Sequence, residues 1–218
     1  MGSAKQILPF WSKLEENEKI LIENSIRIEK YSKGMLIHRT ENSCIGLMTV
    51  LSGQLRTYIL SDEGREVTLF RVQHDEVCVL SASCLMDTIT FDVLIEATEN
   101  TEVMIIPATV LNQIMAQNPY VELYLYKSAT EKFSDVMWTM QQILFFKIDQ
   151  RVARFLWDEM TQKNSMTLYI THDEVAKYIG SAREVITKVM KYLSQENVIE
   201  LKRGMVIITD KEKLYKLI

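Results

Sequence analysis

The chain has 218 residues, of which 47% are hydrophobic, and a formal net charge of −4. Its apolar runs are strand-length and interrupted by charge, which excludes a membrane-spanning helix and predicts a soluble globular protein. The N-terminal residues form no apolar signal core, and the three cysteines contain no CxxC pair, so we expect a cytoplasmic protein with reduced thiols.

The charge is distributed unevenly along the chain. Residues 1–146 carry 12 Lys and Arg against 19 Asp and Glu, a net charge of −7. Residues 147–218 carry 13 against 10, a net charge of +3. The C-terminal part is therefore where contact with nucleic acid is to be sought.

The N-terminal part reads as a helix followed by many short strands. Helical spacing of apolar residues predicts a helix over 13–28. From about residue 33 to 106, short alternating segments are separated by turn signals. The clearest is a hairpin over 54–70, with a Gly-containing turn at 62–64. Strands this short and regular predict an antiparallel β-roll.

A long helix is predicted after Pro119, because apolar residues there recur every three or four positions. This stripe either packs onto the β-roll of the same chain or forms a seam between two parallel copies, and both can hold at once. A monomer would cover such a long stripe poorly, which favours a homodimer. The expected seam consists of Tyr126, Thr130, Phe133, Met137, Met140 and Leu144.

Two capping boxes of the form S/T-x-x-E follow, one over 171–174 and one over 181–184. Each predicts the start of a short helix, and Gly180 lies between the two. Apolar residues at helical spacing give both helices one buried face. Two short helices joined by a tight turn predict a helix-turn-helix.

The second helix has a buried face of Ile186, Val189, Met190 and Leu193, which turns its polar residues outward. Arg183 at its start is able to donate two hydrogen bonds to guanine, and Glu184 to accept one from cytosine. The alternative is an ordinary solvated first turn in which the cap occupies Glu184.

A hairpin over 197–208 follows, with Lys202 and Arg203 at its turn. In a winged helix-turn-helix these two side chains would meet phosphate, whereas a free-standing hairpin would simply face solvent. The residues expected to bind DNA are Thr171, His172, Ser181, Arg183, Glu184, Thr187, Lys188, Lys191, Lys202 and Arg203.

The segment 170–193 resembles the winged-helix signature of the Crp/Fnr family of bacterial transcription regulators, and the likeness extends over almost the whole chain. Ala182 stands where the family usually has Ser, and Lys188 where it usually has Arg. The resemblance implies an α+β chain with a cyclic-nucleotide-binding-like jelly roll over 1–118, a dimerisation helix over 119–146 and a DNA-binding domain over 147–218. It also implies double-stranded DNA with a palindromic site, a second copy of the chain and RNA polymerase as partners.

Family members that bind cyclic AMP would show a Gly-Glu pair and then Arg-Ser in the roll. The corresponding positions here hold Phe91 and Asp92, and an acidic side chain would repel phosphate. We therefore expect no cyclic AMP and no other cofactor, and an unidentified effector in the roll.

Some relatives hold an iron–sulfur cluster on four thiolates. Cys44, Cys78 and Cys84 provide three, so a cluster would need a fourth ligand such as His74. The alternatives are small buried hydrophobic residues or reversible oxidation of Cys78 and Cys84.

The histidines offer two further alternatives, a haem ligand at His38 or His74 and a cupin-like metal enzyme. Because His38, His74 and His172 form no His-x-His pair, and no catalytic motif is present, we expect no enzymatic activity. A third alternative is an interaction module that has lost DNA binding, which the basic residues of the second helix and the wing argue against.

Overall fold

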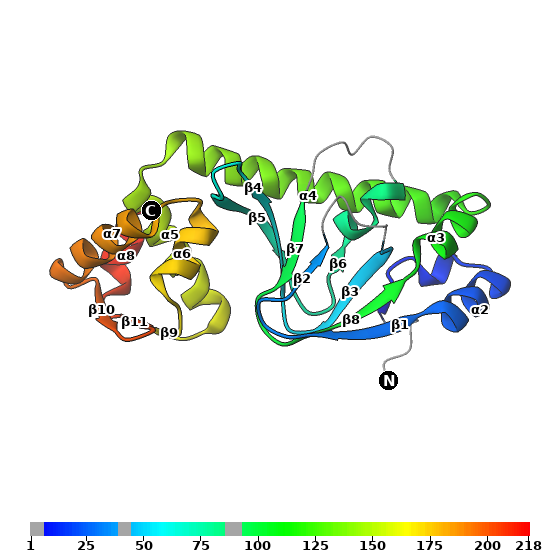
Figure 1. Ribbon diagram of the computed structural model, residues 1–218, viewed down its shortest axis with the longest axis horizontal. Coiled ribbons are helices and arrows are strands. Elements are labelled where there is room, and N and C mark those ends of the chain that lie inside the picture. Colours follow the sequence, from blue (N-terminus) through cyan, green and yellow to red (C-terminus); the bar gives the residue numbers. More distant parts are fainter. Residues whose placement is uncertain (1–6, 39–44, 86–92) are drawn as a thin grey trace. The chain divides into compact units, whose positions relative to one another are not determined.

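The computed structural model describes residues 7–38, 45–85 and 93–218 (Figure 1). The chain divides into two compact units, one of Met1–Ile59 with Leu69–Val136 and one of Leu60–Thr68 with Met137–Ile218. Each unit encloses a hydrophobic core of its own. No helix among the described residues is long and apolar enough to cross a membrane.

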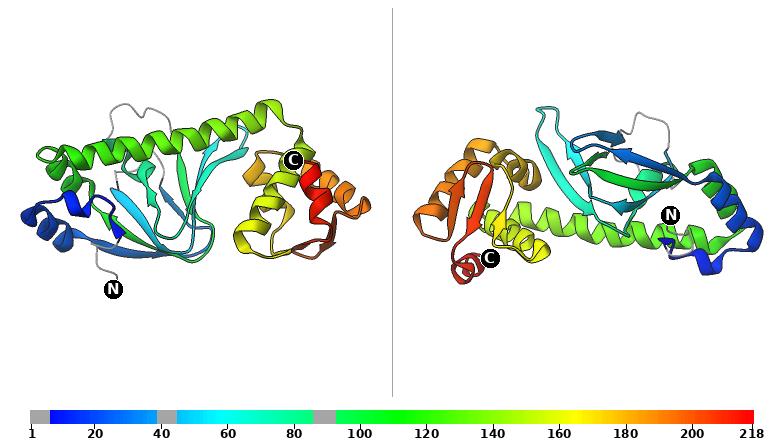
Figure 2. Two further views of the ribbon diagram at one scale, coloured as in Figure 1. Left: turned by 180° about the vertical axis from the view of Figure 1, so that it is seen from behind. Right: turned by 90° about the horizontal axis from the view of Figure 1, so that it is seen from below.

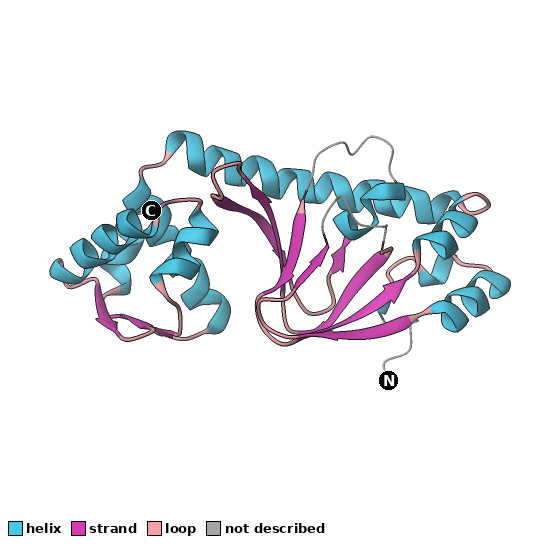
Figure 3. Cartoon of the chain, in the orientation of Figure 1, coloured by secondary structure: helices cyan, strands magenta, loops and turns pink. Residues whose placement is uncertain are grey.

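The N-terminal elements are mostly strands, as Figure 3 shows. Their helical segments are η1 (Trp11–Lys13), α2 (Glu16–Ser25), η2 (Val79–Leu85), α3 (Ala108–Met115) and α4 (Pro119–Phe145). Their strands are β1 (Arg27–Tyr31), β2 (Leu36–His38), β3 (Leu47–Ser52), β4 (Leu55–Leu60), β5 (Glu66–Val72), β6 (Val77–Cys78), β7 (Leu94–Ala97) and β8 (Thr101–Ile106).

These strands form two four-stranded sheets within the described ranges, in the orders β1-β8-β3-β6 and β2-β7-β4-β5. The described strand pairs are antiparallel, and the predicted hairpin is present as β4 and β5. Fully buried side chains such as Leu47, Leu55 and Ile95 come from both sheets. The predicted antiparallel β-roll is therefore confirmed.

The predicted helix over 13–28 is wrong at its C-terminal end. Helix α2 ends at Ser25, and Ile28 lies in β1 opposite Met104 of β8. Within α2, Ile22 is fully buried, whereas Ile20 is 51% exposed. The apolar spacing was ambiguous, because a short segment can fit both the helical and the strand periodicity. Pairing with β8 makes residues 27–31 a strand. Helices α2 and α3 lie side by side at one end of the roll (Figure 2).

Helix α4 has two apolar faces. On one face Val121 and Leu125 are fully buried, and Tyr124, Ala129 and Val136 pack against the core of the roll. The six residues of the expected seam are all exposed, with Phe133 at 62% and Leu144 at 59%. The stripe that packs onto the roll and the stripe predicted to form a seam are thus different residues of one helix.

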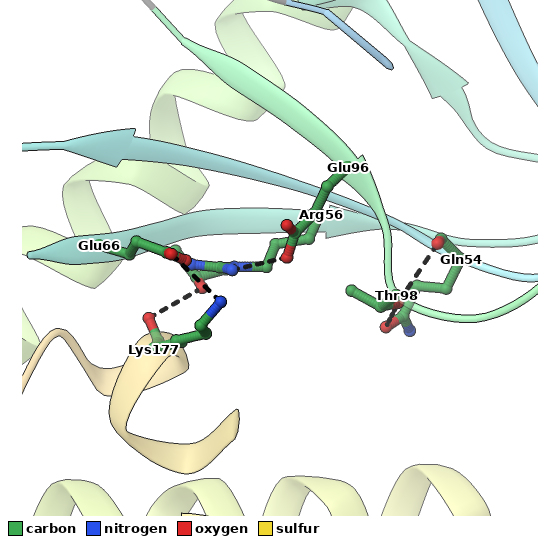
Figure 4. Close-up of polar contacts among 7 residues, drawn as sticks. Gln54, Arg56, Glu66, Glu96, Thr98 and Lys177 are labelled. Carbon is green, nitrogen blue, oxygen red and sulfur yellow. Dashed lines mark hydrogen bonds and ion pairs between the residues drawn. The ribbon is translucent and has the colours of Figure 1, made fainter. Parts of the chain in front are cut away.

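An ion pair lies between two strands of the roll (Figure 4). Arg56 of β4 and Glu96 of β7 are register partners, and Nη1 of the arginine lies 2.7 Å from Oε1 of the glutamate. Their side chains are only 5% and 17% exposed. Beside them the Thr98 hydroxyl donates to the backbone and side-chain oxygens of Gln54. Such buried polar side chains have partners because burying an unpaired polar or charged group costs free energy.

The C-terminal elements are helices with a small sheet (Figure 3). The helices are α5 (Ile148–Lys163), α6 (His172–Ile179), α7 (Arg183–Gln195) and α8 (Lys211–Lys216). The strands are β9 (Thr167–Leu168), β10 (Ile199–Lys202) and β11 (Met205–Ile208), in the order β10-β11-β9. Strands β10 and β11 are the hairpin that the sequence predicted directly after the second short helix.

Candidate nucleic-acid interface

Helix α6 begins with the capping box that the sequence predicted. The Thr171 hydroxyl oxygen accepts a hydrogen bond from the backbone N–H of Glu174 at 3.2 Å. In return, Oε2 of Glu174 accepts from the backbone N–H of Thr171 at 2.8 Å and from its hydroxyl at 3.0 Å. Both side chains therefore satisfy the helix start, so Thr171 has less hydrogen-bonding capacity left for DNA than the sequence suggested.

Gly180 joins α6 to α7 in a left-handed conformation, with φ of 72° and ψ of 46°. A residue with a Cβ is strained there, which explains glycine at this position. Beyond it Ile186, Met190 and Leu193 of α7 are buried with Val175 and Ile179 of α6. This shared core fixes the two helices as a helix-turn-helix.

The second predicted capping box is absent. Helix α7 has Ala182, rather than Ser181, as its N-cap, and no side chain accepts a hydrogen bond there. The sequence pattern misplaced the helix start by one residue, because the last turn before α7 belongs to the left-handed connection at Gly180. Glu184 is consequently the second residue of α7 rather than the third, which a capping box requires, and its exposed carboxylate takes no part in one.

The outer face of α7 carries Arg183, Glu184, Lys188 and Lys191, all exposed as predicted. One residue that sequence reasoning missed, Asp173 of α6, lies beside them. Its Oδ2 is 3.2 Å from Nη1 of Arg183, with the two side chains 52% and 64% exposed. The sequence shows an acid in the first turn of α6, but only the angle between the two helices brings it to Arg183.

His172 contacts α7 through a hydrogen bond. Its Nδ1 lies 3.0 Å from Oγ1 of Thr187, and Thr187 is half-buried rather than fully outward-facing. Burial lowers the pKa of His172 below its usual value, and the positive charges of Arg183 and Lys191 lower it further, against the opposing effect of Asp173. The imidazole is thus mostly neutral at neutral pH.

The wing presents two basic side chains at its turn. Lys202 and Arg203 are exposed, and Gly204 closes the turn with φ of 68°. Nζ of Lys202 lies 3.3 Å from Oε1 of Glu200, and both side chains of this ion pair are exposed to solvent. Exposed pairs of this kind are weak, so the lysine remains available to a stronger anion such as phosphate. Ser181 is half-buried at the turn between the helices.

The candidate sensor residues differ from each other. Cys78 is fully buried with a free thiol, and burial raises the pKa of that thiol to about 11, so it is a poor candidate for oxidation. Cys84 is disulfide-bonded, which contradicts the expectation of reduced thiols, since neither an odd number of cysteines nor the lack of a CxxC pair prevents one bridge. Cys44 and Phe91, together with Asp92, lie outside the described residues.

Histidines and acids do not gather into a metal site in the part of the chain that the structure describes. His74, the fourth ligand considered for a cluster, is exposed, and its Nε2 lies 3.3 Å from Oδ2 of the neighbouring Asp75. His172 belongs to the helix-turn-helix. These two histidines thus lie far apart in the sequence and have unrelated partners.

Two domain families match the chain. Residues 28–118 match the cyclic nucleotide-binding domain, and residues 150–217 match the Crp-like helix-turn-helix domain. Among solved structures, the chain is similar to a crp/fnr-family transcriptional regulator from Eubacterium rectale ATCC 33656, with 42% identity and a TM-score of 0.94. That match covers 97% of this chain and 98% of the other.

Curated relatives are similar over most of their length. The transcriptional activator protein Anr of Pseudomonas protegens is 28% identical, over 82% of this chain and 75% of the relative. The transcriptional regulator flp of Lacticaseibacillus casei is 23% identical, over 97% of this chain and 96% of the relative. The cyclic-di-GMP-responsive regulator CLP of Xanthomonas campestris shares the fold, with a TM-score of 0.77 and 17% identity over 90% of this chain and all of the other.

Proposed function

The chain belongs to the Crp/Fnr family of transcription regulators, and on this premise we propose that it binds a palindromic operator as a homodimer. The observation that carries the proposal is the outer face of α7. Arg183 and Glu184 stand exposed at the start of the helix, and no capping box occupies Glu184. A guanidinium and a free carboxylate at the N-terminal turn of a recognition helix are matched to guanine and cytosine edges in the major groove.

Phosphate contacts would come from the residues around this turn. His172 and Lys191 flank the recognition residues, Lys188 follows one turn later, and the wing adds Lys202 and Arg203. Such contacts set the orientation on DNA and most of the salt dependence without reading sequence. Thr187 contributes mainly by its contact with His172 of α6, and Thr171 by capping α6. Ser181 lies half-buried at the turn between the two helices.

The homodimer rests on the second apolar face of α4. Its exposed side chains Tyr126, Phe133, Met137, Met140 and Leu144, with Thr130 between them, repeat along the helix at the spacing of a coiled-coil seam. The other face of α4 already packs against the roll, so a second copy is the partner that suits this one. We keep the three-part division from the sequence, in which residues 119–146 lie between the sensor and DNA-binding domains along the chain, although the compact units divide within α4, after Val136.

The effector of the roll is not cyclic AMP in this proposal. A cyclic AMP phosphate needs the Arg-Ser positions, which hold Phe91 and Asp92 in the sequence. The name of one relative, the CRP protein of Salmonella typhimurium, describes it as cAMP-activated, but this chain is only 22% identical to it. The protein would act in the cytoplasm on RNA polymerase at promoters and would have no catalytic activity.

A redox signal is the second candidate for control of DNA binding, and one observation favours it. Cys84 is disulfide-bonded in η2, a segment that packs against β3 and α3 in the roll. Reduction of that bond would free a local constraint in the sensor unit. The buried Cys78 thiol has no part in this candidate.

The test is a pull-down of fragmented genomic DNA with the purified protein, with and without reductant, followed by sequencing of the bound pool. The proposal expects an enriched palindrome in which Arg183→Ala loses the preference for one base pair of each half-site, while the variant keeps its melting temperature. Enrichment in one redox condition only would support control through Cys84. The absence of any enriched sequence in both conditions would contradict the proposed function.

The seam has its own test in the same preparation. Phe133→Asp places a charge in the middle of the exposed stripe, and sedimentation should then show a monomer with the same fold. Lys127→Asp, which also introduces an acid on an exposed position of α4, is the control and should remain dimeric. A monomeric wild-type protein at micromolar concentration would contradict the homodimer.

A further inference from the structure

Asp173 is an acidic side chain on a face that is otherwise basic. It lies in the first turn of α6, and its Oδ2 reaches Nη1 of Arg183 at 3.2 Å. A carboxylate beside the DNA-binding face repels phosphate and so lowers the affinity for any DNA, whatever its sequence. Its presence there needs a physical reason.

The fold supplies only a small part of that reason, because an exposed acid in the first turn of a helix interacts weakly with the helix macrodipole. The capping of α6 is complete without Asp173, because Thr171 and Glu174 satisfy each other. The ion pair with Arg183 is more than half exposed at both ends, and pairs of that kind add little to stability. The side chain therefore adds little to the stability of the helix-turn-helix, whereas its charge lowers DNA affinity.

We infer that Asp173 is a specificity-determining positioning residue, which holds the guanidinium of Arg183 in the orientation that reads guanine. The inference rests on the proposed function. An arginine side chain is long and mobile, and bidentate recognition of guanine needs its planar fork in one orientation. The ion pair with Asp173 involves Nη1, and a guanidinium has five N–H donors, so donors remain that can face a base. When the guanidinium has no guanine to bind, it stays with Asp173, and the carboxylate then repels the DNA.

The test compares Asp173→Ala with the wild type on the operator from the pull-down. Arg183→Ala identifies the base pair that Arg183 reads, as the position where sequence preference disappears. Dissociation constants are then measured by fluorescence anisotropy for the operator and for a version changed at that base pair. We expect Asp173→Ala to bind the changed operator more tightly and to lose about tenfold of the discrimination between the two, with only a slightly lower melting temperature.

Glu200→Ala is the matched control. Glu200 is also an exposed acid paired with a basic side chain of the DNA-binding unit, Lys202 of the wing. Its removal should raise the affinity for both operators equally and leave the discrimination at the Arg183 base pair intact. In an Arg183→Ala background, Asp173→Ala should no longer change discrimination, which separates positioning from a general effect of charge.

The outcomes separate the inference from the function on which it rests. Wild-type discrimination in Asp173→Ala, with DNA binding intact, would overturn the inference and leave the proposed function standing. Equal losses of discrimination in Asp173→Ala and Glu200→Ala would also overturn it. Failure of the wild type to bind any selected sequence would overturn both.

Discussion

His172 and Thr187 join the two helices of the helix-turn-helix through a contact of 3.0 Å between Nδ1 and Oγ1. The contact fixes the ring of His172, so that the other ring nitrogen, Nε2, is the one left for a further partner. Because His172 lies against α7, its protonation adds a positive charge beside the outer face of that helix.

DNA affinity should rise as the pH falls below neutral. Burial and the nearby Arg183 and Lys191 lower the pKa of free His172 below 6.5, while Asp173 opposes them. Phosphate stabilises the imidazolium, so DNA binding would raise this pKa and take up a proton. At a pH between the pKa of His172 in the free protein and its pKa in the DNA complex, lowering the pH by one unit raises the affinity at most about tenfold for each His172 that contacts DNA. Anisotropy titrations at constant ionic strength measure this slope.

The stability of the DNA-binding unit, unlike its DNA affinity, should fall as the pH drops. Because the folded pKa of His172 is lower than the unfolded one, the unfolded chain binds more protons, and stability falls as the pH drops below about 6.5. His172→Gln should remove both effects, whereas His74→Gln, at an exposed histidine in the roll, should keep them. A DNA affinity in His172→Gln that keeps the wild-type slope would show that another group titrates.

Ala182→Ser should stabilise the DNA-binding unit. Ala182 is the N-cap of α7 with φ of −71° and ψ of 142°, a conformation in which a serine hydroxyl accepts from the backbone two or three residues later. We expect a gain of about 1 kcal/mol and a rise in melting temperature of about 2–4 °C. Scanning calorimetry of the full chain measures it. Ser181→Ala is the control and should have little effect, and a larger loss there than the gain at Ala182 would place the cap at Ser181.

The Cys78 thiol should be inert in the folded protein. It is fully buried, and its pKa of about 11 leaves well under 1% thiolate at pH 8. Iodoacetamide should therefore label Cys78 only after denaturation, as read by mass spectrometry of the tryptic peptides. Cys78→Ala should keep any redox response of DNA binding. Rapid labelling of Cys78 at pH 7.5 would mean that the roll opens in solution.

Breaking the ion pair in the roll should be costly. Arg56→Met leaves the carboxylate of Glu96 without its guanidinium at a site that is only 17% exposed, and we expect a loss of about 3–5 kcal/mol. The double variant Arg56→Met with Glu96→Leu should regain much of this loss, because no lone charge remains. Urea denaturation of the full chains gives the three values. A double variant less stable than Arg56→Met would contradict this explanation, because the unpaired carboxylate of Glu96 would then not be the source of the loss.

The sequence by itself determined the order and type of the main elements. Period-two alternation predicted the strands of the roll, the repeat after Pro119 predicted α4, and the capping box at Thr171 with the spacing around Gly180 predicted the helix-turn-helix. These signals are local, since each depends on residues within one or two turns of a helix or along one strand. The exposed positions of α7 followed from the same periodicity, because burying one face of a helix fixes the other.

The tertiary structure decided what depends on pairing between distant segments. Pairing of β1 with β8 made Ile28 part of a strand, and the angle between α6 and α7 brought Asp173 to Arg183 and His172 to Thr187. The cap of α7 moved to Ala182 because the left-handed connection at Gly180 sets where that helix starts. No local pattern carries this information, since the energy of such contacts depends on how two elements pack rather than on the residues of either one alone.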